Sequence, residues 1–99
     1  MDLINWLQQW YISNCNGDWE HNYGIKIETI DNPGWYIKID VSETSLEDKY
    51  VGRQMIDNGD TDWYSYKLEN SVYEAFGDPL KLELLIIIFK RIVDKDLNE

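Results

Sequence analysis

Apolar residues recur along this chain at two different spacings, and each spacing predicts its own kind of element. In residues 2–14 they lie three or four positions apart, which is the period of an amphipathic helix. In residues 23–31 and 35–41 every second residue is apolar, which predicts two half-buried antiparallel strands. Residues 31–34 read Asp-Asn-Pro-Gly, a turn in which Pro presets the first backbone angle and Gly accepts a positive one, so a hairpin is expected. The apolar stripe of the helix consists of Leu3, Ile4, Leu7, Trp10 and Tyr11.

The middle of the chain predicts three further strands. Residues 42–49 are polar and acidic and are expected to form a loop or a helical turn before a strand over residues 50–56. Residues 58–59 read Asn-Gly, a strong tight-turn signal, and the aromatic content of residues 63–68 is typical of a strand, so a second hairpin follows. Residues 72–76 add a last strand.

A second amphipathic helix completes the predicted order. Asp78 is expected as its N-cap and Pro79 as its first residue, and the helix should run to about residue 94. The sequence therefore predicts an α+β fold: an antiparallel β meander of about four to five strands, with the N- and C-terminal helices packed on one face. The buried stripe of the second helix consists of Leu82, Leu85, Ile88, Phe89 and Ile92.

Length and charge limit the kind of partner. The 99 residues, 43% of them hydrophobic, suit one domain over residues 1–99 that folds without a metal or a disulfide. Nineteen acidic against nine basic residues give a net charge of -10, which repels nucleic acid and anionic lipid and attracts basic protein surfaces. An alternative is that the charge serves only to keep the domain well solvated.

The chain is expected in the cytoplasm. Cys15 is the only cysteine, so no intramolecular disulfide forms, and residues 1–5 lack the basic segment that opens a secretory signal. The longest apolar run, residues 84–89, has six residues, whereas a bilayer span needs about twenty. We therefore expect no membrane partner.

Three segments carry a resemblance to a known family. Residues 6–11 read WLQQWY, residues 15–21 read CNGDWEH and residues 32–35 read NPGW. With weaker similarity around residues 62–70 and Gly77, the chain resembles Immunity protein 53, a family of bacterial polymorphic toxin systems whose members are small acidic antidotes. The resemblance implies a protein that binds and neutralises a partner toxin, and it implies no catalytic residue.

We expect such a protein to occlude the active site of its toxin through an acidic surface that also carries aromatic residues. Interface hot spots are enriched in Tyr and Trp, and an acidic surface suits a basic toxin. The predicted partner-binding carboxylates are those of Glu43, Glu47 and Asp48 in the polar loop and of Asp57, Asp60 and Asp62 in the Asn-Gly turn. The predicted aromatic contacts are Tyr36, Tyr64 and Tyr66, which we place together on one sheet face beside Lys38 and Asp40.

Other functions are weaker candidates. Asp18, Glu20 and His21 offer three potential metal ligands, but the sequence shows no fourth ligand nearby, so their expected role is to tie a loop to the sheet. Cys15 would be the nucleophile of a small thiol-dependent enzyme, yet it follows a helix and faces acidic residues, which disfavour a thiolate. We thus expect no metal, no cofactor and no catalysis. The remaining alternative is an acidic protein-interaction adaptor unrelated to toxins.

Overall fold

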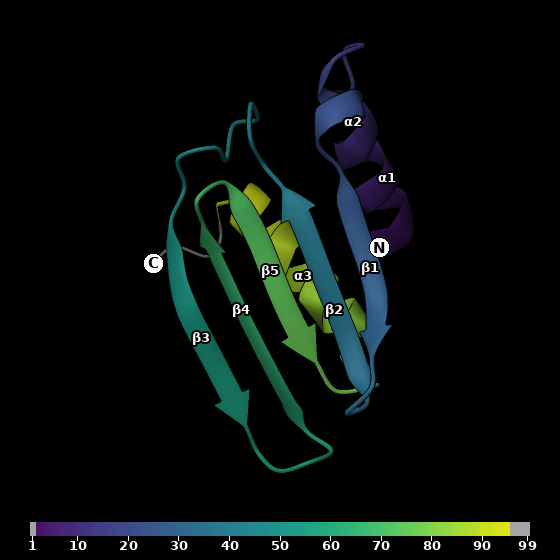
Figure 1. The fold of residues 1–99 in the computed structure, drawn as a ribbon, viewed down its shortest axis with the longest axis vertical. Coiled ribbons are helices and arrows are strands. Elements are labelled where there is room, and N and C mark those ends of the chain that lie inside the picture. Colours follow the sequence, from purple (N-terminus) through teal and green to yellow (C-terminus); the bar gives the residue numbers. More distant parts are fainter. Residues whose placement is uncertain (1, 96–99) are drawn as a thin grey trace.

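The computed structural model describes residues 2–95, which form one antiparallel sheet with helices on one of its faces (Figure 1). Met1 and residues 96–99, which the predicted domain includes, lie outside the described residues. The α+β class and the presence of five antiparallel strands are confirmed. In chain order the elements are α1 (Leu3–Asn14), α2 (Trp19–Asn22), β1 (Ile25–Ile30), β2 (Gly34–Asp40), β3 (Val51–Asp57), β4 (Trp63–Glu69), β5 (Val72–Gly77) and α3 (Leu82–Val93).

The strand order departs from a continuous meander in one place. The sheet runs β1-β2-β5-β4-β3, so β5 lies between β2 and β4, and residues 41–50 carry the chain from β2, next to one edge, to β3 at the opposite edge. The register pairs Ile37 with Ala75 and Ile39 with Tyr73, all of them buried. The two strands with the most buried residues, β2 and β5, therefore lie side by side inside the sheet, and β1 and β3 are its edges. The alternation of apolar and polar residues predicts strands, but it does not predict the order in which those strands lie in the sheet.

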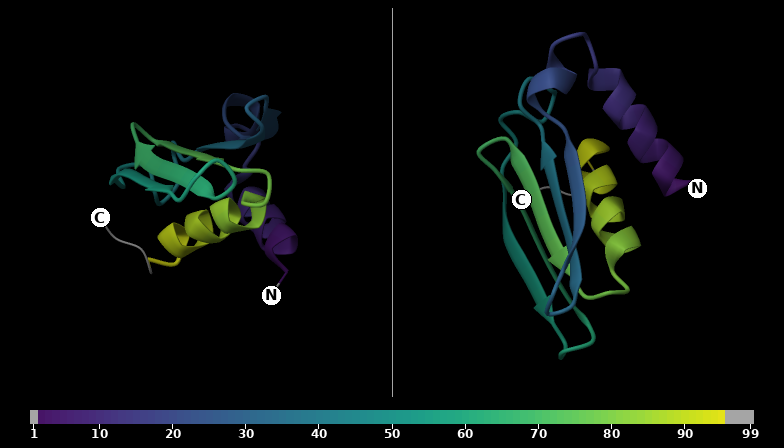
Figure 2. Two further views of the ribbon diagram at one scale, coloured as in Figure 1. Left: turned by 90° about the horizontal axis from the view of Figure 1, so that it is seen from below. Right: turned by 45° about the vertical axis from the view of Figure 1, so that its right-hand side comes forward.

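Both terminal helices lie on the same face of the sheet, as predicted (Figure 2). α3 packs against β5, and the fully buried Phe89 of α3 also meets Trp6 and Trp10 of α1. The buried stripe of α1 is shifted from the predicted one, because Trp6 packs against the core whereas Ile4 is 58% exposed and Tyr11 is also exposed. The shift follows from α1 packing against α3. No helix within residues 2–95 has the length and apolar character that crossing a membrane requires.

α3 begins later than predicted. Its first residue is Leu82 and its N-cap position is Lys81, whereas Asp78 and Pro79 lie in the preceding turn. Asp78 therefore does not cap α3; its side chain caps the turn that precedes α3 by accepting the backbone N–H of Leu80. This side chain is completely buried and also accepts one backbone hydrogen bond, from Trp63 of the neighbouring strand β4.

The first hairpin forms where expected, but glycine is needed there for a different reason. The Asn32–Pro33 peptide bond is cis. Gly34 is the first residue of β2, and its φ angle is not positive, in contrast to the prediction. A Cβ atom at Gly34 would overlap the carbonyl oxygen of Gly77 on the adjacent strand, so only glycine allows this close approach. β1 is also more exposed than a half-buried strand, with Ile27 39% exposed at the sheet edge.

Candidate functional site

The two predicted acidic segments lie at opposite ends of the edge strand β3 (Figure 1). The loop over residues 41–50 precedes β3, and the turn over residues 58–62 follows it. Seven residues of β3 separate them, and an extended strand of that length spans roughly 23 Å. A partner must therefore lie along the whole β3 edge to touch both acidic segments.

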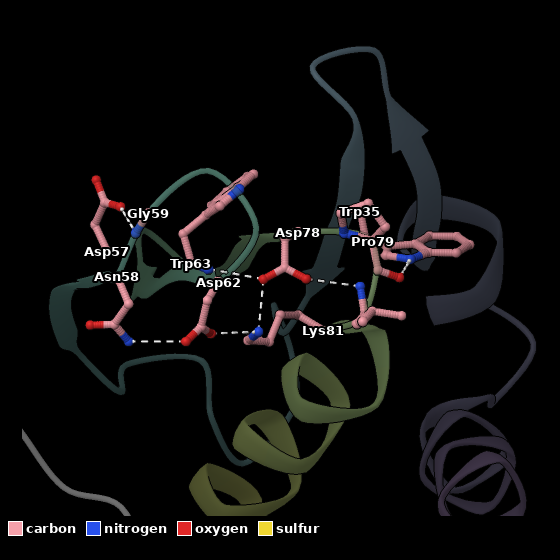
Figure 3. A network of polar contacts seen from close by, with 10 residues as sticks. Trp35, Asp57, Asn58, Gly59, Asp62, Trp63, Asp78, Pro79 and Lys81 are labelled. Atoms are coloured by element: carbon pink, nitrogen blue, oxygen red, sulfur yellow. Dashed lines mark hydrogen bonds and ion pairs between the residues drawn. The ribbon is translucent and has the colours of Figure 1, made fainter.

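Asp62 in the β3–β4 turn is exposed but is held by an ion pair and a hydrogen bond (Figure 3). One of its carboxylate oxygens lies 2.8 Å from Lys81 Nζ, and the other accepts a hydrogen bond from the Asn58 amide at 3.3 Å. Both contacts favour the charged carboxylate, so the pKa of Asp62 is lowered, first by Lys81. Asp62 thus fixes the turn to the start of α3.

Lys81 joins this turn to the buried Asp78 (Figure 3). Its ammonium lies 2.7 Å from Asp78 Oδ2, which also accepts the backbone N–H of Trp63 at 2.9 Å, while Oδ1 accepts that of Leu80 at 2.9 Å. Burial disfavours the charged form of Asp78, but the Lys81 contact and the two backbone N–H donors outweigh it and lower its pKa. The pKa of Lys81 is raised, first by Asp62 and then by Asp78. The network therefore holds the turn, β4 and α3 together.

The remaining turn carboxylates are exposed. Asp57 Oδ1 accepts the backbone N–H of Gly59 at 3.0 Å, and Gly59 has a φ angle of 122°, which favours glycine. Asp60 lies exposed at the tip of the turn. Asp57 and Asp60 are thus better placed than Asp62 to meet a partner.

The acidic loop before β3 is anchored to the domain at three points. The buried Leu46 joins the core, the indole N–H of Trp19 donates to the Ser42 carbonyl at 2.9 Å, and the Ser71 hydroxyl donates to the Glu47 carbonyl at 2.8 Å. These contacts hold the backbone; among the predicted carboxylates, that of Glu43 also accepts a hydrogen bond from the Tyr23 hydroxyl at 3.4 Å, and all three are exposed. The three carboxylates are those of Glu43, Glu47 and Asp48.

The three predicted tyrosines do not share a face of the sheet, which corrects the sequence-based grouping. Tyr36 lies on the helix-free face, opposite Phe76 of β5, with ring centroids 4.8 Å apart. Its hydroxyl donates to Glu74 at 2.7 Å. Desolvation, followed by the hydrogen bond to Glu74, raises the pKa of Tyr36 to about 12.

Tyr64 and Tyr66 lie on the face that carries the helices. The register places them opposite Gly77 and Ala75 of β5, and both side chains pack partly against the core. Their two rings are stacked, with the ring centroids 6.4 Å apart. Leu68, two residues after Tyr66, points to the same face of the sheet. The alternation along β4 could therefore have predicted the orientation of Tyr64 and Tyr66.

Sequence reasoning missed two exposed apolar residues on the β3 edge. Tyr50, just before β3, is 60% exposed, and Met55 within β3 is 59% exposed. Met55 also borders a concave region of about 370 Å³ beside the turn. Both lie between the carboxylates of Asp48 and Asp57, and the exposed Arg53 lies between the two apolar residues, so the β3 edge is acidic at its ends and carries two apolar side chains and the Arg53 cation in its middle. The concave region is lined by Asn32, Met55, Asp57, Gly59, Asp60 and Trp63.

Two of the alternative chemical candidates, Glu20 and Cys15, make local hydrogen bonds to backbone groups. The Glu20 carboxylate accepts the backbone N–H groups of Asn16 and Gly17 at 3.0 and 2.9 Å, and backbone hydrogen bonds lower its pKa despite some desolvation. The half-buried Cys15 donates its thiol to the Tyr11 carbonyl at 3.3 Å. Within residues 2–95, no three His, Cys, Asp or Glu side chains gather as a metal site would require.

These features define a small acidic α+β domain in which helices cover one face of a five-stranded sheet and the acidic loops lie at the ends of an edge strand. The chain belongs to the Immunity protein 53 family, whose sequence profile matches residues 4–94. No curated protein and no solved structure matches it.

Proposed function

We propose that this protein is an immunity protein that binds a cognate bacterial polymorphic toxin in the cytoplasm and occludes its active site. The observation that carries the proposal is membership of the Immunity protein 53 family across residues 4–94. The exposed acidic segments and the exposed apolar residues between them support a binding role.

The proposed toxin-binding surface is the β3 edge, which we define by Glu47, Asp48, Tyr50, Met55, Asp57 and Asp60, with Glu43 at its margin. Exposed apolar residues at the centre of an interface supply affinity, while charges at the rim supply orientation and fast association. The β3 edge supports this role, because the exposed Tyr50 and Met55 lie between its acidic carboxylates, with the exposed cation of Arg53 between the two apolar residues. Tyr36, Tyr64 and Tyr66 lie outside the β3 edge and are secondary candidates.

The proposed toxin is basic. A net charge of -10 attracts cationic surfaces and repels nucleic acid. A toxin that acts on nucleic acid carries a basic cleft for phosphate, and the acidic ends of the β3 edge would occupy that cleft in place of the substrate. This mechanism requires no cofactor, no metal and no catalytic residue in the immunity protein.

The second candidate, an acidic adaptor unrelated to toxins, has the same charge in its favour. The two differ in biological effect, since only an immunity protein rescues a cell from the toxin encoded beside its gene. A thiol-dependent enzyme is less consistent with the structure, because the Cys15 thiol is used in a helix-end hydrogen bond.

Co-expression tests the proposal directly. Cells that express the toxin domain of the neighbouring gene should grow only when this protein is present, and the two purified proteins should form a complex. A variant with Met55→Asp should lose rescue, because a charge replaces the central exposed apolar side chain, whereas Ile12→Asp, at a 62% exposed position on α1, should retain it. Lack of rescue by the wild-type protein would exclude the immunity function, and rescue by the Met55 variant would exclude the β3 edge.

A further inference from the structure

The opposite edge of the sheet has an uncovered strand with a defined hydrogen-bonding pattern. β1 is the outermost strand, and its neighbour on the inner side is β2. The N–H of Asp40 in β2 donates to the carbonyl of Gly24 at 3.1 Å. Because hydrogen-bonded pairs alternate along an antiparallel ladder, the N–H and C=O groups of Ile25, Ile27 and Thr29 point away from β2, toward the open edge.

An apolar groove lies beside these outward-pointing groups. It has a volume of about 470 Å³ and runs between α1 and β1 on the helix-bearing face. Ile4 from α1 and Ile27 from β1 line it, and they are 58% and 39% exposed. Exposed apolar side chains next to unpaired strand groups are the features of a sheet edge that receives another strand.

The charges on β1 determine which strand fits. Edge strands are often protected by charges, because like charges would face one another across a new pair. In β1, however, Lys26 and Glu28 flank Ile27 on the helix-free face. In an antiparallel pair of two β1 strands centred on Ile27, each Lys26 lies opposite the Glu28 of the other copy, and each Ile25 lies opposite Thr29.

We propose that β1 pairs with β1 of a second copy of this chain, antiparallel and centred on Ile27, to form a symmetric dimer with a continuous ten-stranded sheet. The outward groups of Ile25, Ile27 and Thr29 supply six backbone hydrogen bonds across the two-fold axis. Lys26 and Glu28 form two ion pairs at non-hydrogen-bonded positions, where side chains of paired strands come closest.

The dimer leaves the proposed toxin-binding surface accessible. β1 and β3 are the two opposite edges of the sheet, so each β3 edge lies at the far end of its own half of the dimer (Figure 1). The net charge of -10 on each copy opposes self-association at long range. The ion pairs between Lys26 of one copy and Glu28 of the other offset this repulsion locally in the proposed register.

Because the dimer uses the β1 edge and the toxin the β3 edge, the inference goes beyond the proposed function and does not depend on it.

Charge reversal provides the experiment. Sedimentation equilibrium of the purified full chain, from low micromolar to several hundred micromolar, should give a dimer for the wild type. Lys26→Glu alone and Glu28→Lys alone each place two like-charged pairs across the interface, and each should weaken the dimer roughly tenfold or more. The double variant Lys26→Glu, Glu28→Lys should regain it.

A mixture of the two single variants gives the sharpest outcome, because every cross-strand pair then joins opposite charges. The mixture should form heterodimers where each variant alone is monomeric. Ile27→Pro provides a backbone test, since it removes an outward N–H that β2 does not use, and it should abolish the dimer while far-ultraviolet circular dichroism reports a retained fold.

Three results would overturn the proposal. A wild-type chain that stays monomeric at all concentrations has no such interface. A dimer that is insensitive to the charge variants forms through another surface. If the chain is monomeric and Ile27→Pro weakens its complex with the toxin, the β1 edge pairs with a strand of the toxin instead of a second copy.

Discussion

The indole ring of Trp10 meets the ring of Phe89 edge to face, with the centroids 5.0 Å apart and the planes at 88°. This contact joins the first helix of the chain to the last, and it links α1 to the core that α3 forms with the sheet. Edge-to-face aromatic pairs stabilise beyond the area they bury, by about 0.5–1.5 kcal/mol.

The first prediction follows from this packing. Trp10→Ala and Leu85→Ala should each lower the free energy of unfolding by about 2–5 kcal/mol, because both remove packed side chains and leave a cavity. Leu80→Ala is the control, since Leu80 is 88% exposed and its removal leaves no cavity. Denaturant midpoints measure all three, and unchanged midpoints for the first two variants would contradict the packing of both helices on one face.

The second prediction concerns the close approach of β2 and β5. Gly34→Ala should lower the free energy of unfolding by about 1–3 kcal/mol or more, because the added methyl group meets the Gly77 carbonyl oxygen and the strands must move apart. Gly24→Ala is a matched control, with no atom within 4 Å of the added carbon. Equal stabilities of the two variants in thermal unfolding would disprove the clash.

The sequence predicted the five strands and the two terminal helices because the signals for them are local, but it did not predict α2, where a loop was expected. The alternation of β2 and the Asn-Gly turn after β3 depend on neighbouring residues alone, and both hairpins form as predicted. The strand order was not predictable in this way, because the pairing of Ile39 with Tyr73 joins distant segments. Asp78 shows the same limit: Gly-Asp-Pro is a local helix-start pattern, yet Trp63 and Lys81 bind its carboxylate instead.

The candidate site was predictable only in part. All six predicted carboxylates are exposed, since charged loop residues remain solvated. The sequence did not indicate that Asp62 is held by Lys81, because the partner lies in a distant turn. Nor did it show that Met55 faces solvent, because that depends on β3 being an edge strand.

The third prediction is a pH dependence at acidic pH. The pKa values of Asp62 and Asp78 are lowered in the folded chain, so the stability they contribute is present above their unfolded pKa of about 3.9 and is lost as the pH falls below it. Asp78→Asn should lower stability at pH 7 and make the loss below about pH 4 shallower. Unfolding in denaturant across an acid series measures this, with Asp60→Asn as the control. An identical acid profile for Asp78→Asn and wild type would exclude a role for this carboxylate.

The fourth prediction concerns alkaline pH. The pKa of Tyr36 is raised to about 12, and that of the buried Tyr73 is also raised well above its usual value, both first by desolvation. Unfolded tyrosine ionises near pH 10, so the folded state should lose stability as the pH rises from about 10 to 12, where only the unfolded chain releases these protons. Tyr36→Phe should reduce the slope of stability against pH in that window, and Tyr73 should account for part of what remains. A slope that does not change would show that Tyr36 ionises equally in both states.

The fifth prediction separates steering from folding at the proposed toxin-binding surface. Asp57→Asn combined with Asp60→Asn should slow association with the toxin several-fold at low salt and flatten its salt dependence, because these exposed charges act at a distance. Tyr50→Ala or Met55→Ala should instead shorten the lifetime of the complex, since close apolar contacts act mainly on dissociation. Asp62→Asn should affect binding only by loosening the turn, because Asp62 is paired with Lys81. Thermal unfolding of this variant would reveal that loosening. Glu83→Gln, which removes one exposed charge on α3, is the control for the net-charge change of each single turn substitution. Surface-binding kinetics across a salt series distinguish these effects, and unchanged association for the Asp57 and Asp60 double variant would remove the β3–β4 turn from the interface.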